Sequence, residues 1–148
     1  HLFVLGDGDS SPYQKMAEKL SIAEHVHFFG GRTDVPRFLL GADVLMHPAR
    51  KENTGTVILE AIVAGLPVLV TDVCGYAKHV GKSAAGLVSR SPFNQVDFNA
   101  QLNSMLAKES LEKWSLNGLS YAASEDLYSM PTKVADIIDQ MTHAKIKQ

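Results

Sequence analysis

Short apolar runs alternate with longer amphipathic stretches along most of the chain. The apolar runs predict strands over residues 2–5, 26–29, 43–47, 68–71 and 85–88. The first of them, Leu2–Leu5, has no polar interruption, which is typical of a strand buried on both faces of a sheet. Because stretches with helical periodicity separate the strands, the pattern predicts an α/β fold with a Rossmann-like, doubly wound parallel sheet.

The helical stretches lie between the strands and then fill the end of the chain. They predict helices over residues 13–20, 35–42 and 55–64 and a short helix after Gly75. From residue 94 onward the period stays helical, so a helical C-terminal region is expected, with helices over 96–107, 111–123 and 127–141. The aromatic residues of that region, Trp114, Tyr121 and Tyr128, are expected to pack the helices together rather than to line a site.

Composition narrows the class of protein. The chain has 148 residues, of which 45% are hydrophobic and 20% charged, as in globular domains. The net charge of −2 gives no electrostatic footprint for a nucleic acid partner. Cys74 is the single cysteine, so an internal disulfide is excluded and a reducing compartment fits. No apolar run approaches the roughly 20 residues of a membrane span. A cytoplasmic protein is expected.

The stretch from His47 to Thr71 is the most informative for function. Thr54, Gly55 and Thr56 lie where the helix over 55–64 should begin, and a Thr or Asn is expected as its N-cap. Free backbone N–H groups at a helix start form a site for phosphate. This turn therefore predicts a cradle for a phosphorylated ligand.

Two carboxylates flank this turn. Glu52 lies on the preceding loop and Glu60 lies on the helix itself. The helix is apolar almost all round, so Glu60 is expected to be partly buried, which costs free energy unless the carboxylate is paired or ligand-bound. A phosphate cradle between two hydrogen-bond acceptors suits a nucleotide sugar. The alternative interpretation is that Glu52 and Glu60 are ordinary exposed glutamates, which are common on surface helices.

Several other residues allow two interpretations. Arg32 follows a strand, where open α/β sheets bind ligands, but it also fits an exposed loop. His47 either contacts the ligand or only ends its strand, and Gly6 and Gly8 either cradle phosphate or only make a tight turn. Cys74 is expected to be a buried thiol rather than a nucleophile. The six histidines lack the i, i+4 spacing of a helical metal pair, so no metal is predicted.

The spacing of this region resembles that of a known family. The pattern Pro48-Ala49-x-x-Glu52-x-x-Gly55-x-x-x-x-Glu60-Ala61-x-x-x-Gly65-x-Pro67-Val68 is similar to the E-x7-E region of the retaining GT-B glycosyltransferases of family 4. Further segments resemble the glucosyltransferases of the bacterial lipopolysaccharide core, among them 26–35, 42–49, 59–69, 73–77 and 126–131. Many family members carry Gly-Gly-x-x-Glu where this chain has Cys74 to Lys78, which favours the narrower resemblance.

The resemblance implies a role for each candidate residue. Glu52 would meet the hydroxyls of the transferred sugar as the catalytic anchor of the donor, and Glu60 would meet the ribose hydroxyls of UDP. The backbone of Thr54, Gly55 and Thr56 would receive the diphosphate, and Arg32 would lie near the uracil. Glucose would pass from UDP-glucose to a heptose of the inner core with retention of configuration, without a metal or other cofactor.

The resemblance also implies a partial domain. Residues 1–148 would be the donor-binding part, lacking their first strand and helix and an N-terminal domain that binds the lipopolysaccharide acceptor. The isolated chain is therefore expected to be inactive, and an open sheet edge could pair with a second copy. Attachment to the inner face of the inner membrane would fit the acceptor. Two alternatives stay open, namely a UDP-sugar 2-epimerase of similar shape and a non-catalytic interaction module.

Overall fold

The computed structural model describes the backbone of residues 1–127 and 129–146, and the side chains of these residues up to residue 140. The chain divides into two compact units, His1–Gly41 and Ala42–Gln148. Tyr128 lies outside the described residues, and so does the prediction made for it.

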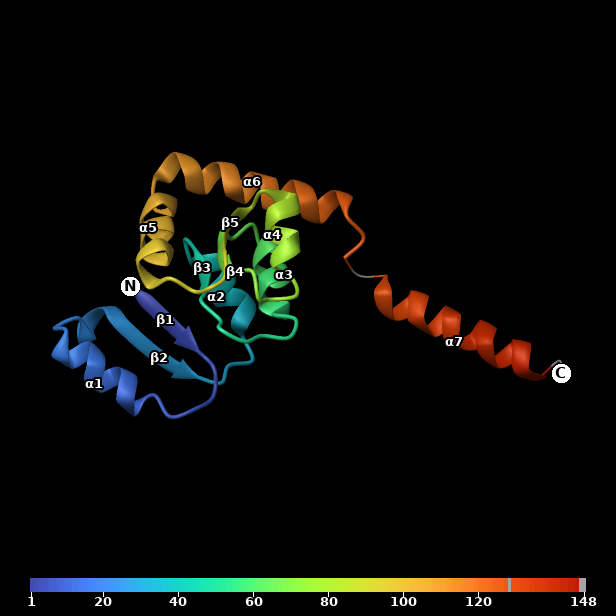
Figure 1. Cartoon of the computed structure of the whole chain (residues 1–148), viewed down its shortest axis with the longest axis horizontal. Helices are drawn as coiled ribbons and strands as arrows, with labels where there is room; N and C mark the ends of the chain where they lie inside the picture. Colours follow the sequence, from blue (N-terminus) through green and yellow to red (C-terminus); the bar gives the residue numbers. More distant parts are fainter. Residues whose placement is uncertain (128, 147–148) are drawn as a thin grey trace. The chain divides into compact units, whose positions relative to one another are not determined.

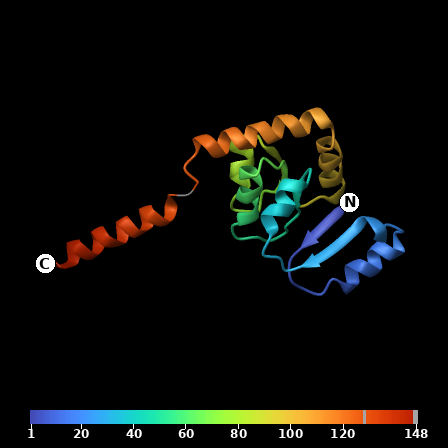
Figure 2. The same ribbon diagram turned by 180° about the vertical axis from the view of Figure 1, so that it is seen from behind.

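The first unit is built on a pair of parallel strands. β1 (Leu2–Leu5) pairs with β2 (Val26–Gly30), and Leu2 lies opposite Val26 in the register. The connection contains α1 (Ser11–Lys19) and the short 3-10 helix η1 (Ala23–His25), and α2 (Val35–Gly41) follows the second strand. α1 lies alongside the two strands in both ribbon views (Figure 1, Figure 2).

The expectation that the first strand is buried on both faces is wrong. Leu2 and Phe3 keep 41% and 48% of their surface accessible to solvent. Among the described residues β1 pairs with β2 alone, so its other edge has no neighbouring strand whose side chains would cover them. An uninterrupted apolar run therefore does not by itself show that a strand is central.

The second unit contains the larger sheet. β3 (Leu45–His47), β4 (Val68–Thr71) and β5 (Gly86–Ser89) are parallel and occur in that order across the sheet. All four residues of β4 are buried, as expected for the central strand. The helices of this unit are α3 (Thr56–Val63), α4 (Ala77–Ser83), α5 (Gln95–Met105), α6 (Lys108–Ser124) and α7 (Met130–Ile146).

Packing in the second unit confirms the predicted role of two aromatic residues. Leu69 of the central strand packs with Phe98 and Met105 of α5, and Trp114 of α6 lies against this cluster. Tyr121 is also buried, and its hydroxyl lies 2.7 Å from Nδ1 of His79 on α4. The aromatic side chains therefore join helices to the sheet and to one another.

The α/β class is confirmed, but the strands do not form one sheet. Every pairing is parallel, and helices connect successive strands, as in a Rossmann-like fold. The hydrogen bonds nevertheless divide the strands into one sheet of two and another of three. In the part of the chain described here, β1, β2, β3 and β5 each have one edge that pairs with no strand. Self-association through such an edge remains a prediction.

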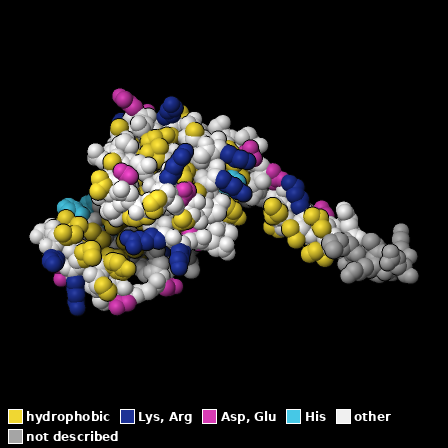
Figure 3. Space-filling view, viewed as in Figure 1, with side chains coloured by type: hydrophobic (Ala, Val, Ile, Leu, Met, Phe, Trp, Pro, Cys, Tyr) yellow, Lys and Arg dark blue, Asp and Glu magenta, His cyan; other side chains and the backbone are white. Residues whose placement is uncertain are grey.

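The surface carries charges of both signs. Lys and Arg side chains are interspersed with Asp and Glu on the face drawn in Figure 3. Exposed hydrophobic side chains occur in both units, for example Phe29 in β2 and Ile137 in α7. Among the described residues, no helix has both the length and the apolar character needed to cross a membrane.

Candidate functional site

The loops that follow β3, β4 and β5 meet at one edge of the larger sheet. All three strands are parallel, so their carboxyl ends lie on the same side. The hydroxyl of Thr71, at the end of β4, donates a hydrogen bond of 2.6 Å to the carbonyl of Ala49 in the loop after β3. The N–H of Asp72 donates at 2.9 Å to the carbonyl of Ser89, the last residue of β5. These bonds fix the loops relative to the sheet.

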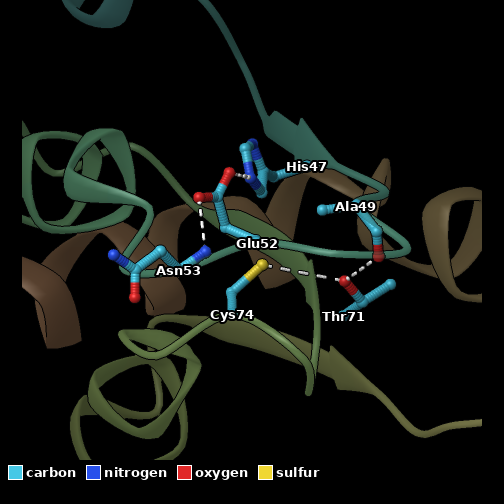
Figure 4. Close-up of polar contacts among 6 residues, drawn as sticks. All are labelled: His47, Ala49, Glu52, Asn53, Thr71 and Cys74. Carbon is cyan, nitrogen blue, oxygen red and sulfur yellow. Dashed lines mark hydrogen bonds and ion pairs between the residues drawn. The ribbon is translucent and has the colours of Figure 1, made fainter.

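Glu52 lies in the first of these loops, between His47 and Asn53 (Figure 4). Its Oε1 accepts a hydrogen bond of 2.7 Å from the N–H of Asn53, and its Oε2 lies 3.4 Å from Nε2 of His47. The side chain of Glu52 keeps 31% of its surface accessible. The carboxylate is therefore held in one orientation and still reaches solvent.

His47 ends β3 with its ring turned toward Glu52 (Figure 4). Within the described residues, its buried Nε2 makes no hydrogen bond, although Oε2 of Glu52 lies only 3.4 Å away. A protonated ring would still form an ion pair at this distance. His47 therefore lies beside Glu52 without a hydrogen bond to it, and direct contact of His47 with a ligand stays a prediction.

The start of α3 differs from the expected cap. Its N-cap is Gly55, with φ of 70° and ψ of 59°, and no side chain caps the helix. A Cβ at this position would come within 2.8 Å of Cδ1 of Ile58. The prediction of Thr or Asn as N-cap is therefore wrong, because this turn requires a left-handed backbone, which favours glycine, and an added Cβ would collide with Ile58.

The backbone at this turn is fixed but has free donors. The carbonyls of Asn53 and Thr54 accept hydrogen bonds from the N–H groups of Gly75 and Tyr76, at 3.2 and 3.0 Å, which attach the loop to the segment before α4. Within the described residues, the N–H of Thr56 makes no hydrogen bond to a carbonyl or side chain, as is usual in the first turn of a helix. The start of α3 can therefore accept an anion.

Glu60 lies on α3 with its side chain exposed, contrary to expectation. The buried residues of α3 are Ile58, Ala61 and Ile62, which form one face. Thr56 and Glu60 are four residues apart and both exposed, so they share the opposite face. The argument that burial makes an unpaired Glu60 costly is therefore wrong, although the same exposure leaves the carboxylate free to accept hydrogen bonds.

Arg32 belongs to the first unit and is already engaged there. Its guanidinium donates hydrogen bonds of 2.8 and 3.0 Å to the carboxylate of Asp34. These hydrogen bonds lower the pKa of the Asp34 carboxyl. The other five candidates, Glu52, Thr54, Gly55, Thr56 and Glu60, all lie on one loop and one helix of the second unit. A role for Arg32 beside them stays a prediction.

Cys74 is buried, as predicted, with 3% of its surface accessible. Its Sγ lies 3.7 Å from Oγ1 of Thr71. Burial raises the pKa of the Cys74 thiol, and the negative charges of Glu52 and Asp72 act in the same direction. No three His, Cys, Asp or Glu side chains gather to hold a metal ion in the part of the chain that the structure describes. Independence from metal stays a prediction.

The sequence interpretation missed a cavity of about 400 Å³ at the same edge of the sheet. Arg50, Arg90 and Phe93 are among the residues that line it. Arg90 directly follows β5, so the rule that pointed to Arg32 after β2 would also have identified Arg90.

A family model described as glycosyl transferases group 1 matches residues 1–120. The lipopolysaccharide glucosyltransferase WaaG of Escherichia coli K12 is 46% identical over 138 residues, which are 93% of this chain and 37% of that protein. The lipopolysaccharide core biosynthesis mannosyltransferase LpsB of Rhizobium meliloti is 29% identical over 112 residues, or 74% of this chain and 32% of that protein. The chain thus spans about a third of the length of these relatives.

Two solved structures share the fold of this chain. The crystal structure of WaaG matches with a TM-score of 0.87, over 93% of this chain and 37% of that one. A structure of Anabaena HepE in complex with UDP-glucose matches with a TM-score of 0.78 at 20% identity, over 93% of this chain and 40% of that one. The second likeness concerns the fold alone.

Proposed function

Because the chain belongs to the group 1 glycosyltransferases, we propose that it is the donor-binding part of a retaining GT-B enzyme that transfers glucose from UDP-glucose to a heptose of the lipopolysaccharide inner core. The observation that carries the proposal is the 46% identity to WaaG over 93% of this chain. The site supports it, because Glu52, the start of α3 and Glu60 follow one another along a single loop and helix.

The diphosphate of the donor would bind at the start of α3. The backbone of Thr54, Gly55 and Thr56 supplies the cradle, and the left-handed glycine keeps Cβ atoms away from it. The N–H of Thr56 is free in the described structure and points out of the first helical turn, where the helix dipole favours negative charge.

The two glutamates would then hold the two sugars of the donor. Glu60 is exposed on the same face of α3 as Thr56, so its carboxylate can accept hydrogen bonds from the ribose hydroxyls. Glu52 would accept hydrogen bonds from hydroxyls of the glucose. Arg32, in the first unit, would lie near the uracil.

During transfer, the bond between C1 of glucose and the diphosphate oxygen breaks, and UDP leaves with its electron pair. A bond from C1 to the oxygen of a heptose hydroxyl forms on the same face, and the hydroxyl proton passes to the departing diphosphate or to water. Positive charge develops on the glucose ring, and the ionised Glu52 stabilises it from a fixed position. The N–H of Asn53 holds one carboxylate oxygen in that position, and the ring of His47 lies beside the other. We assign no general base, and as proposed the reaction requires no metal or other cofactor.

The remaining parts of the proposal concern the acceptor and the place of action. The relatives are much longer than the chain, and we propose that acceptor binding belongs to sequence outside residues 1–148. The enzyme would act on the cytoplasmic side of the inner membrane, where nucleotide sugars are available. No observation favours the two alternatives, a UDP-sugar 2-epimerase and a non-catalytic interaction module. The relatives named above are a glucosyltransferase and a mannosyltransferase.

A calorimetric titration of the chain with UDP tests the donor assignment. Binding is expected, and Glu60→Ala should weaken it by about tenfold, because hydrogen bonds from the ribose to a carboxylate are lost. Glu112→Ala removes an exposed carboxylate from α6 and serves as the matched control. Equal affinities of the Glu60 and Glu112 variants would contradict the role of Glu60, and a folded chain that binds no UDP would contradict the donor site.

A further inference from the structure

The cavity at the carboxyl edge of the larger sheet is lined by none of the proposed donor residues. The cavity of about 400 Å³ is lined by Arg50 after β3, by Thr71 at the end of β4 and Val73 after it, and by Arg90 and Phe93 after β5, among others. Glu52, Glu60 and the start of α3 are not among the lining residues. Its volume is in the range of sites for small ligands.

Two arginines give this cavity its chemical character. Neither Arg50 nor Arg90 forms an ion pair or a side-chain hydrogen bond with any residue that the structure describes, unlike Arg32, which is paired with Asp34. The Arg50 guanidinium lies over the ring of Phe93, 5.4 Å from its centroid. This contact holds the guanidinium through its face and leaves its N–H groups, which lie in the guanidinium plane, available to a ligand.

The loop that carries Arg90 is fixed by a neighbouring carboxylate. Asp72 accepts a hydrogen bond of 3.0 Å from the N–H of Ser91 and a second one from its hydroxyl. These bonds, together with the positive charge of Arg90, lower the pKa of the Asp72 carboxyl. Because its oxygens are occupied by Ser91 and it does not line the cavity, Asp72 orders the rim without blocking it.

The walls of the cavity are partly apolar. Val73 keeps 37% of its surface accessible, and the ring of Phe93 is half-buried against Phe98, with centroids 5.5 Å apart. Two arginines suit a phosphoryl group, which accepts bidentate hydrogen bonds, and apolar walls suit the C–H face of a sugar ring. These two features together match a phosphorylated saccharide better than a free sugar or a free phosphate.

We propose that this cavity binds the phosphomonoester of a phosphorylated saccharide, with Arg50 and Arg90 as its ligands, at a site separate from the donor. The saccharide is either a free sugar phosphate or a phosphorylated group on the acceptor, and both present the same chemistry to the two arginines. The inference rests on the geometry of the second unit and not on the proposed transferase activity.

The test is a titration of the isotope-labelled chain, followed by two-dimensional amide NMR spectra. The probes are glucose 6-phosphate, glucose, inorganic phosphate and UDP. Glucose 6-phosphate is expected to shift the amides of Arg50, Val73, Arg90 and Phe93, and to bind more tightly than glucose or inorganic phosphate. UDP should shift the amides at the start of α3 and should not displace it.

Variants assign the binding to the two arginines. Arg50→Gln and Arg90→Gln should each weaken binding of glucose 6-phosphate by about tenfold, since each removes a charge-assisted hydrogen bond. Arg37→Gln removes an exposed arginine from the first unit and is the matched control. UDP affinity should be the same in all three variants. The spectra also show whether each variant is folded. Arg50 and Arg90 are both exposed, so each variant should fold and can be tested for binding by itself.

Three outcomes would overturn the proposal. One is that glucose 6-phosphate binds no more tightly than glucose or inorganic phosphate, and another is that the arginine variants bind glucose 6-phosphate as the control does. The third is displacement by UDP, which would make the cavity part of the donor site. Failure of UDP to bind, with glucose 6-phosphate still bound, would count against the proposed function alone. In a protein of the relatives' full length, competition by phosphorylated rather than dephosphorylated acceptor would assign the phosphate to the acceptor.

Discussion

Oε2 of Glu52 lies 3.4 Å from Nε2 of His47, across the turn that connects β3 to α3. The histidine is the last residue of its strand, so the rigid sheet determines where its ring lies. The other carboxylate oxygen accepts the N–H of Asn53 at 2.7 Å. The backbone N–H therefore orients the carboxylate before any ligand binds, with the ring of His47 beside its second oxygen, and pre-organisation of this kind is what electrostatic catalysis requires.

Replacing Glu52 by Gln should lower kcat for transfer by about 100-fold in a protein of the relatives' full length, because the neutral amide cannot stabilise positive charge on the glucose ring. Steady-state rates with UDP-glucose and a heptose-terminated acceptor measure the effect. UDP affinity should not change, since Glu52 is proposed to contact the glucose and not the nucleotide.

Glu112→Gln is the control for this variant, because it removes an exposed carboxylate from α6, outside the proposed site. If both variants kept the rate of the parent enzyme, Glu52 would have no catalytic role.

Strand positions could be predicted because they depend on local pattern. Val68–Thr71 is predicted as a strand from four residues, and all four are buried in the structure. Pairing between strands depends on residues far apart in sequence, so the division into two sheets could not be predicted from the same pattern. The exposure of Leu2 follows from that division.

The sequence predicts which residues form the site but not how they are oriented. The spacing of Glu52, Gly55 and Glu60 is enough to place them on one loop and the helix that follows it. The N-cap is Gly55 rather than Thr54 or Thr56 because Gly55 has a positive φ. The surrounding chain imposes this conformation, so the local sequence does not reveal it. The exposure of Glu60 depends on which face of α3 packs inward, and an almost entirely apolar helix does not specify that face.

Gly55→Ala should destabilise the second unit by about 1–3 kcal/mol, because a left-handed backbone is strained for Ala and its Cβ would meet Ile58. Urea unfolding followed by the fluorescence of Trp114, which packs against the core of this unit, measures the change. Gly81→Ala is the matched control, since this glycine lies in α4 with open space around it.

The control should be neutral or slightly stabilising, because Ala favours helix over Gly. If the two variants unfolded at the same urea concentration, the conformation assigned to Gly55 would be wrong.

Cys74 should react slowly with Ellman's reagent in the native chain. Its thiol is buried, and burial raises its pKa, so little reactive thiolate is exposed at neutral pH. The same chain in concentrated urea should react to completion with one thiol per chain, which provides the internal control. Native and unfolded chains that reacted at equal rates would contradict the burial of Cys74.

The stability of the second unit should decrease as the pH falls below about 6.5, through the titration of His79. Burial, and then the positive charges of Lys78 and Lys82, lower the pKa of His79 in the folded chain, while Glu125 opposes this weakly. In the unfolded chain the ring regains its ordinary pKa, so the unfolded state binds the proton first as the pH falls. Protonation therefore favours unfolding, and the loss of stability continues until the pH is below the pKa of His79 in the folded state.

His79→Gln keeps a side chain that can hydrogen-bond Tyr121 but cannot titrate. Thermal unfolding between pH 5 and pH 8 should thus show a smaller decrease in Tm for the variant than for the parent chain, and parallel curves would show that His79 titrates equally in both states.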